Sequence, residues 1–570
     1  MGRTEEELRD LLYEMDRRGY PAYKSLRGSY DFSGGKLSID HVQGDPFASP
    51  TKASAYLPAR VGGWPEDLLF TPERVVAFED FLTRRLSRAL DDRSRVVGGS
   101  GKSGMLGTSR PGPEVLTRSA CTATREGVTI RFELGLPARG RTVDGRGAAR
   151  MLLELVPDAL DEALVADEEA VAQAREAAEL ADDQAFVRDE LERLGLVAFV
   201  ADGSVLPRRS GVSSAPMEGA LPFRSPDSLA VTLDLPHRGP TRGMAIRRGV
   251  TLVVGGGYHG KSTLLRALQE GVYDHVAGDG RELVVTDASA VKLRSEDGRS
   301  VRATDISLFI GNLPSGADTR AFSTDDASGS TSQAAGTVEA ALSGSRVLLI
   351  DEDTSATNFM VRDELMEAVV NPDHEPITPF VERVRDLWER AGISSVIVAG
   401  SSGAFFTVAD TVVQMDCYEA HDVTERARTA CERMGAGRVP SAPGFALPAT
   451  EAPCRIRTAR DERGLRARSF GREGVQVGEG SADLRLVEQL VEAEQVAAIA
   501  QLVRKAAQLG LLDGTLGAAE VAERLLAGVA DGGWEVVAEH GVMASGLALP
   551  RAYELAAALR RWRNERPRQS

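Results

Sequence analysis

The sequence predicts an α/β fold, with an α/β core between an α+β N-terminal domain and a mainly helical C-terminal domain. Strand and helix patterns alternate from Gly249 to about Tyr418, which is typical of a parallel sheet covered by helices. Short strands and turns dominate before this stretch, and apolar residues at helical spacing dominate after it. The chain has 570 residues, and at roughly 150 residues per domain a single small domain is excluded. We expect an N-terminal α+β domain with an acidic helical segment (1–200), a connecting segment (201–245), the α/β core (246–435), a linker with short strands (436–480) and a helical C-terminal domain (481–570).

The N-terminal region begins with an amphipathic helix. Within residues 4–18, the side chains of Leu8, Leu11, Leu12 and Met15 fall on one helical face. A β-hairpin is expected around Gly34, a second helix over 72–91 and a strand over 128–132.

Residues 151–195 form the clearest helical block. They carry 14 acidic and three basic side chains, a local net charge of 3 − 14 = −11. We interpret the acidic face as the solvated side of a helix pair, and a surface that docks or repels a partner is the alternative. Prolines interrupt residues 200–245, which indicates a connection. The C-terminal helices of 481–564 end in an arginine cluster of Arg560, Arg561, Arg563, Arg566 and Arg568.

The most specific motif is a glycine-rich segment between a buried strand (250–254) and a helix. It fits G-x-x-x-x-G-K-[ST] at every fixed position. Glycines let successive backbone N–H groups face phosphates, and the following helix N-terminus adds partial positive charge. We expect Lys261 to reach the β- and γ-phosphates of ATP and Ser262 to bind Mg²⁺. The predicted nucleotide-binding residues here are Gly255, Gly256, Gly257, Tyr258, His259, Gly260, Lys261, Ser262 and Thr263.

A second G-K-S sequence, at residues 101–103, lacks the rest of this motif. The position of the required first glycine is Val96, and no apolar strand leads into the segment. We interpret Gly98–Gly104 as a flexible loop with a positive tip at Lys102, and a phosphate-binding role as the alternative.

An apolar strand over 346–352 ends in two carboxylates. In P-loop enzymes an Asp at the end of such a strand holds Mg²⁺, so we assign Asp351 to the metal. The next residue, Glu352, is the candidate general base, and with Lys261 it completes the predicted catalytic pair.

Between these motifs, small hydroxyl residues and a glycine precede an Ala-rich helix. Ser328, Gly329 and Ser330 there are suited either to bind an anion or to cap the helix. The segment alone leaves both interpretations open.

In this order the elements resemble ATP-binding-cassette (ABC) ATPases, in which the Ser-Gly segment occupies the position of the signature sequence and residues 353–358 that of the D-loop. The chain is more closely similar to one soluble family, the predicted ATPases of the ABC class. The similar stretches are 255–265, 278–299, 327–335, 351–366, 375–380 and 400–410 in the core, and 41–48 and 135–141 outside it.

The resemblance implies a soluble homodimer with an ABC-type P-loop ATPase core over 246–435. Each Mg-ATP would lie between the P-loop of one subunit and Ser328, Gly329 and Ser330 of the other. It also implies handling of RNA or another nucleic acid.

The sequence departs from the general ABC pattern at three places. The signature has Ser330-Thr331-Ser332 where a second glycine is usual, Gly400–Gly403 stands where a switch histidine is expected, and no glutamine marks a Q-loop. Lys292, Arg294, Glu296 and Asp297 lie in the Q-loop interval instead. Fast hydrolysis is therefore not implied. His259 is either a substitute for the histidine or a packing residue.

Our first function hypothesis is an ATPase that closes as a dimer on Mg-ATP and grips a partner such as RNA. The alternative is a nucleotide-gated clamp for nucleic acid with little turnover. A small-molecule kinase is less consistent with the signature and D-loop, and a transporter subunit is less consistent with the large flanking domains.

Charge and cysteine content restrict the partners and the compartment. The net charge of −16 argues against a protein that coats nucleic acid through its overall field. We interpret Arg139, Arg141, Arg146 and Arg150, and the C-terminal cluster, as solvated surface, and a local basic channel built from either set is the alternative. Four cysteines without C-x-x-C spacing indicate reduced thiols. We expect a cytoplasmic protein with no signal peptide and no membrane domain of its own.

Overall fold

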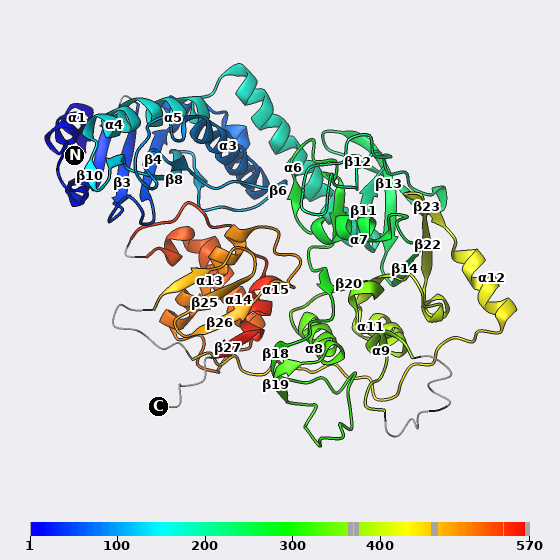
Figure 1. The fold of residues 1–570 in the computed structure, drawn as a ribbon. Coiled ribbons are helices and arrows are strands. Elements are labelled where there is room, and N and C mark those ends of the chain that lie inside the picture. The colour runs from blue at the N-terminus through cyan, green and yellow to red at the C-terminus, as the bar shows by residue number, and fades with distance from the viewer. Residues whose placement is uncertain are drawn as a thin grey trace. The chain divides into compact units, whose positions relative to one another are not determined.

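The computed structural model describes residues 2–32, 34–362, 369, 375–457, 465–539 and 541–564. The chain forms two compact units (Figure 1). The first comprises Met1–Asp182 and Gly528–Leu549, and the second comprises Asp183–Ala527 and Pro550–Ser570.

A seven-stranded sheet organises the first unit. Its order is β1-β2-β3-β4-β8-β5, with β7 also paired to β8; β1 runs parallel to β2 and the other neighbours are antiparallel. The predicted hairpin is confirmed as β2 and β3. The strands of this unit are β1 (Arg3–Thr4), β2 (Gly28–Phe32), β3 (Gly35–His41), β4 (Thr51–Pro58), β5 (Leu106–Gly107), β6 (Glu114–Val115), β7 (Cys121–Ala123), β8 (Gly127–Leu134), β9 (Ala138–Arg139) and β10 (Thr142–Val143).

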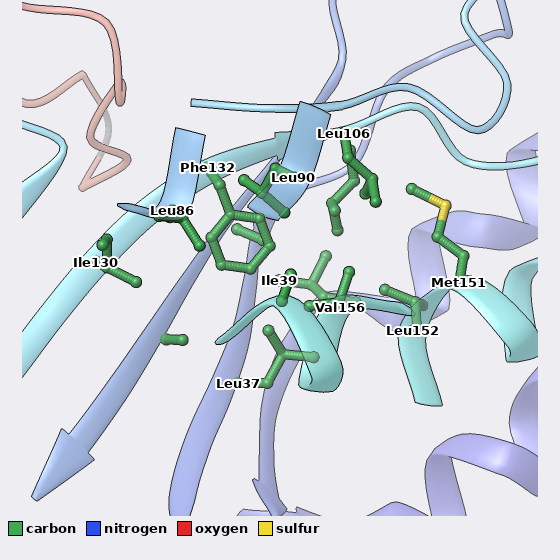
Figure 2. Packing of buried hydrophobic residues seen from close by; sticks show 14 of the residues in the cluster. Leu37, Ile39, Leu86, Leu90, Leu106, Ile130, Phe132, Met151, Leu152 and Val156 are labelled. Atoms are coloured by element: carbon green, nitrogen blue, oxygen red, sulfur yellow. The ribbon is translucent and has the colours of Figure 1, made fainter. Parts of the chain in front are cut away.

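The core of the first unit lies between this sheet and its helices. Side chains alternate along a strand, so Leu37 and Ile39 of β3 and Ile130 and Phe132 of β8 are buried. Figure 2 shows them packed with apolar residues of two helical segments. These residues are Leu86 and Leu90 of α3 (Pro72–Arg93) and Met151, Leu152 and Val156 around the start of α5 (Val156–Leu164).

The predicted helices of the N-terminal region are confirmed. Thr4 caps α1 because its side chain accepts the Glu7 N–H while the Glu7 carboxylate accepts the Thr4 N–H. The acidic block becomes a π-helical turn (Met151–Leu155) and two helices. The helices here are α1 (Glu5–Glu14), α2 (Ala59–Gly62), α3 (Pro72–Arg93), α4 (Gly145–Arg150), α5 (Val156–Leu164) and α6 (Glu168–Leu194).

A segment from near the C-terminus belongs to this first unit. The Ser119 hydroxyl donates to the Ala544 carbonyl over 2.8 Å, and the Leu549 N–H donates to the Thr117 carbonyl over 2.9 Å. Arg131 forms an ion pair of 2.8 Å with Glu535. The chain therefore returns to its N-terminal unit over residues 528–549, which nothing in the sequence had indicated.

A six-stranded sheet of order β17-β20-β21-β14-β22-β23 forms the α/β core of the second unit. All its pairs are parallel except β22 with β23. This confirms the predicted alternation of strand and helix. The strands are β14 (Val250–Val254), β17 (Val291–Leu293), β20 (Val347–Asp351), β21 (Ser394–Val398), β22 (Thr411–Asp416) and β23 (Glu419–Asp422), and the helices are α7 (Lys261–Glu270), α8 (Gly329–Leu342), α9 (Thr357–Met360), α11 (Val384–Ala391) and α12 (Thr424–Met434).

Residues 201–245, expected to connect domains, also contribute two strands. They join an antiparallel sheet of order β12-β13-β11-β16. Pro240 is tolerated because it is the second residue of β13, at the end of the ladder. The strands are β11 (Leu196–Ala201), β12 (Ala230–Leu235), β13 (Gly239–Arg247) and β16 (Val284–Thr286); elsewhere in this unit lie β15 (Asp274–His275) and the hairpin of β18 (Arg299–Thr304) and β19 (Phe322–Ala327).

The described residues of the C-terminal region form three α-helices, in line with the mainly helical domain expected there, and a small antiparallel sheet of order β24-β25-β26-β27. Val475 and Ala482 on one face of this sheet are buried, as is Trp562. The elements are β24 (Ala467–Ser469), β25 (Gly474–Val477), β26 (Gly480–Asp483), β27 (Trp562–Asn564), α13 (Ala493–Leu509), α14 (Ala518–Gly532) and α15 (Ala552–Arg560). Within the described part of the chain, no helix has the length and apolarity needed to cross a membrane.

Candidate functional site

The register of three parallel strands brings the predicted motifs to one edge of the sheet. Asp351 at the end of β20 lies opposite Val398 of β21, and Val398 lies opposite Val253 of β14. Three loops therefore leave the sheet side by side. They are the P-loop that begins at Gly255, the acidic pair that ends β20, and the Gly400–Gly403 loop after β21.

The P-loop is folded around its own lysine. Lys261 is buried, and its Nζ donates to the carbonyls of Gly255 and Gly256 over 2.7 and 2.8 Å. Gly255 has φ +145°, and a Cβ there would lie 2.2 Å from the Met415 carbonyl oxygen, so only glycine fits. Ser262 is exposed in the first turn of α7, where its hydroxyl is accessible to a ligand.

Other P-loop residues face outward or toward a neighbouring turn. The Tyr258 side chain is 99% exposed at φ +65°. The His259 Nδ1 accepts the Cys417 N–H over 3.0 Å, and the Tyr418 N–H donates to the His259 carbonyl over 3.1 Å. His259 is thus engaged by the turn between β22 and β23, which supports its interpretation as a packing residue. A hydrogen bond to Asp416, and the charge of that carboxylate, raise the pKa of the Cys417 thiol in the same turn.

The two acidic residues after β20 have different surroundings. Asp351 is 7% exposed, and one carboxylate oxygen accepts the Asp353 N–H over 3.2 Å. The carboxylate of Glu352 is turned toward the Gly400–Gly403 loop. Its Oε2 accepts the N–H groups of Gly400 and Ser401 over 2.6 and 3.0 Å, and its Oε1 accepts the Ser401 hydroxyl over 2.7 Å.

These donors control the ionisation of Glu352. Partial burial alone would raise the pKa of its carboxyl group, but the hydrogen bonds from Ser401, Gly400 and Ser402 outweigh burial and lower the pKa. Sequence reasoning noted only that a histidine is missing at this place. The signal it overlooked is that a Gly-Ser run after a buried strand presents free N–H groups, which suit an anion.

The Ser-Gly segment starts α8. The Ser328 hydroxyl caps the helix by accepting the Thr331 N–H, so the capping interpretation is confirmed. Ser328 is exposed and Ser330 is buried. A Cβ at Gly329 would lie 2.3 Å from the Ser295 Oγ, so this glycine is close-packed in its own chain.

Two residues that sequence reasoning did not assign connect α8 and β17 to the D-loop. Gln333 of α8 donates to the Ser355 hydroxyl over 2.9 Å and accepts the Ala356 N–H over 3.0 Å. The ammonium of Lys292, nearly buried, donates to the Thr354 hydroxyl over 3.3 Å. Burial lowers the pKa of Lys292, and the charges of Glu488 and Asp351 oppose this.

The Q-loop interval also contacts the C-terminal region. Arg294 forms an ion pair of 2.6 Å with Glu488. Arg561 donates to both carboxylate oxygens of Glu296, over 3.0 and 2.5 Å. Arg560 is likewise paired, with Glu451 over 2.6 Å. Arg560 and Arg561 therefore stabilise the fold and are not free for a basic channel. Arg563 is exposed, and Arg566 and Arg568 lie outside the described residues.

The second G-K-S sequence is not a flexible loop, contrary to our expectation. The N–H groups of Ser100, Lys102 and Gly104 donate to the carbonyls of Ala138, Pro46 and Gly135 over 2.9, 2.8 and 2.7 Å. Because these N–H groups are used internally, they do not face a phosphate. The loop is a packed junction that joins residues 41–48 to residues 135–141.

Comparison with known proteins agrees with this geometry. Residues 5–167 match a family model described as "ATPase of the ABC class N-terminal", residues 170–447 match an ABC-ATPase "P-loop domain", and residues 466–568 match an "MRB1590 C-terminal domain". The uncharacterized protein MJ1628 of Methanocaldococcus jannaschii is 31% identical over 250 residues, which cover 42% of this chain and 54% of that protein. The chain thus spans about half the length of this relative.

Three solved structures show likeness to the chain. One is cbiO1 from Clostridium perfringens, part of the ABC transporter complex cbiONQ (14% identity, 42% of this chain, 93% of that one, TM-score 0.27). The second is MJ1267, an ATP-binding cassette of an ABC transporter in its ADP conformation (11% identity, 43% of this chain, 96% of that one, TM-score 0.25). The third is a bacterial Atm1-family ABC exporter with ATP bound (13% identity, 51% of this chain, 50% of that one, TM-score 0.25).

The strand order, the P-loop and the matched P-loop model define a P-loop ATPase of the ABC type. With the N-terminal and P-loop models together, the chain belongs to the ATPases of the ABC class.

Proposed function

We propose that the protein binds Mg-ATP at the P-loop edge of the core sheet and hydrolyses it. The observation that supports the proposal is the register that aligns Val253, Val398 and Asp351, because it brings the segments that we propose to bind phosphate and metal to one edge of the sheet. The donor set fits Mg²⁺, which prefers oxygen ligands: the exposed Ser262 hydroxyl and the Asp351 carboxylate. Bound Mg²⁺ would offset the negative charge of the phosphates.

The roles of the chain's own groups follow from their present contacts. The Lys261 ammonium would leave the Gly255 and Gly256 carbonyls for the β- and γ-phosphates, a stronger, charge-assisted partner. The N–H groups of the P-loop would orient the phosphates. Glu352 would accept a proton from the attacking water, which requires its carboxylate to leave at least one of its donors on the Gly400–Gly403 loop.

We propose that two copies of the chain enclose the nucleotide. The exposed Ser328, with Gly329 and Ser330 at the start of α8, would approach the γ-phosphate bound by the other subunit. Closure would move the flanking parts of the chain against a partner. We propose that the protein acts in the cytoplasm. Contacts of Lys292, Arg294 and Glu296 with the D-loop and the C-terminal region support this, since they connect the nucleotide edge to those parts.

A clamp with slow turnover is the second candidate. The hydrogen bonds between the Glu352 carboxylate and the Gly400–Gly403 loop favour it. A carboxylate that accepts three hydrogen bonds, of 2.6, 3.0 and 2.7 Å, and has a lowered pKa is a weak base. RNA or another nucleic acid is the proposed partner of either form. Its basic contact would come from the exposed side chains of Arg139, Arg141, Arg146 and Arg150.

Measuring ATP binding and turnover on the same preparation tests the proposal. The ATPase predicts Mg-dependent binding and phosphate release that both fall in Lys261→Ala. The clamp predicts the same binding with negligible release. Binding that survives Lys261→Ala unchanged contradicts both.

A further inference from the structure

The turn that touches the P-loop has an unusual backbone. Cys417 and Tyr418, between β22 and β23, have φ of +48° and +70°. Tight hairpin turns with this conformation favour Gly, Asn or Asp, because other side chains are strained there. The turn nevertheless keeps its contacts to the His259 ring and carbonyl. Strained backbone of this kind is concentrated at functional sites, so the turn is a candidate for holding a ligand.

The imidazole of His259 meets two groups that it cannot satisfy together. Its Nδ1 lies 3.0 Å from the Cys417 nitrogen, a donor, and 2.8 Å from an Asp416 carboxylate oxygen, an acceptor. A protonated Nδ1 would bond Asp416 but turn its hydrogen toward the Cys417 N–H. An unprotonated Nδ1 would accept from Cys417 but face the lone pairs of the carboxylate. A cation between the nitrogen and the carboxylate would use both lone pairs.

A third donor lies beside this pair. One ligand atom each of His259, Asp416 and Cys417 falls within 4.8 Å of the others. All three residues retain access to solvent, so an ion can reach them. The geometry points to a new metal site: we propose that these residues bind a divalent transition-metal cation, with Zn²⁺ the best match.

The donor chemistry selects the metal. Imidazole, carboxylate and thiolate are the usual ligands of Zn²⁺, and three of them leave a fourth tetrahedral position for water. The thiolate disfavours Mg²⁺, which requires oxygen ligands, so this site is chemically distinct from that of Ser262 and Asp351. On binding, the Cys417 thiol loses its proton to solvent and a sulfur–metal bond forms, with no change of oxidation state. The bound cation would fasten the middle of the P-loop to the β22–β23 turn.

Cobalt substitution tests the site, because a thiolate bound to Co²⁺ gives a near-ultraviolet charge-transfer band that oxygen and nitrogen ligands do not. We would titrate the full, reduced chain with Co²⁺ alone, without nucleotide. We expect a thiolate band that saturates at one Co²⁺ per chain and is abolished by one equivalent of Zn²⁺. Cys417→Ser should remove the band, and Asp416→Asn should weaken Co²⁺ binding at least 10-fold.

Cys431→Ser is the matched control, since Cys431 is partly exposed but lies outside the donor cluster; it should leave the band unchanged. The melting temperature of each metal-free variant shows that it is folded. No thiolate band, or a band that persists in Cys417→Ser, overturns the proposal. The proposal is also overturned if an NMR titration of the His259 imidazole is identical with and without Zn²⁺, because His259 and Asp416 then form only an ion pair.

Discussion

Removing the Ser401 hydroxyl should release the carboxylate of Glu352. Ser401→Ala deletes the 2.7 Å bond to Oε1 and leaves the N–H donors of Gly400 and Ser401 to Oε2. A hydrogen bond to a charged group contributes about 1.5–3 kcal/mol. Glu352 is only partly buried, so water replaces some of this, and we take about 1 kcal/mol. If leaving the loop limits catalysis, kcat should rise about fivefold, because 1.4 kcal/mol is a factor of ten.

The assay is steady-state phosphate release with ATP affinity measured in parallel. ATP affinity should stay within about twofold, since the N–H and the hydroxyl of Ser401 both donate to Glu352 and not to the P-loop. The lost donor should also move the pKa of Glu352 upward, so the acid limb of the kcat profile should shift to higher pH. Ser402→Ala is the matched control: its hydroxyl accepts the Ala404 N–H and does not touch the Glu352 side chain. A fall in kcat for Ser401→Ala alone would refute the reasoning, because Ser401 would then assist Glu352 in the reaction.

Two further predictions concern the phosphate loop and the N-terminal core. Lys261→Ala should weaken ATP binding by about 10- to 100-fold in calorimetry, since one charge-assisted contact of about 1.5–3 kcal/mol is lost. Lys102→Ala should leave ATP binding unchanged. Equal effects of the two variants would mean that the packed 98–104 loop binds nucleotide. Burial raises the pKa of Glu79 to about 7, against an opposing hydrogen bond from the Ala123 N–H. Because this pKa is raised in the folded state, the neutral carboxyl group contributes stability at low pH, and this contribution is lost as pH rises toward 7. Glu79→Gln should therefore raise the melting temperature more at pH 8 than at pH 5. An equal change at both pH values would contradict this.

The parts of the site that sequence predicted are those defined by local chemistry. The P-loop and the Asp351-Glu352 pair each occupy a short segment whose residue types are recognisable without tertiary information, and the structure brings both segments to one edge of the sheet. Ser401 and Lys292 were missed because their roles depend on partners distant in sequence, Glu352 and Thr354.

The same contrast applies to the fold. The helix over 72–91 was predicted because its apolar spacing is continuous, and the strands over 250–254 and 346–352 because each contains a run of apolar residues. The strands β12 and β13 were missed, since prolines around them suggested a loop. Residues 528–549 carry no local sign that their partners are Thr117 and Ser119, because such pairing is decided by tertiary packing.

The central proposal is that Mg-ATP closes two chains around the helix start at Ser328. Gly329 is unsuitable for the test because any side chain there meets Ser295. Ser328→Asp and Ser328→Asn both keep a good helix cap, but only Asp adds negative charge. Against a phosphate at about 4 Å that charge costs roughly 1–4 kcal/mol, depending on screening.

Small-angle scattering of the Glu352→Gln protein with and without Mg-ATP is the most direct measurement. Glu352→Gln should retain bound ATP because it lacks the base. We predict a compact dimer on addition of Mg-ATP in this background and with Ser328→Asn, and no compaction with Ser328→Asp although calorimetry still shows ATP bound. Equal compaction of the Asp and Asn variants would contradict the proposed closure.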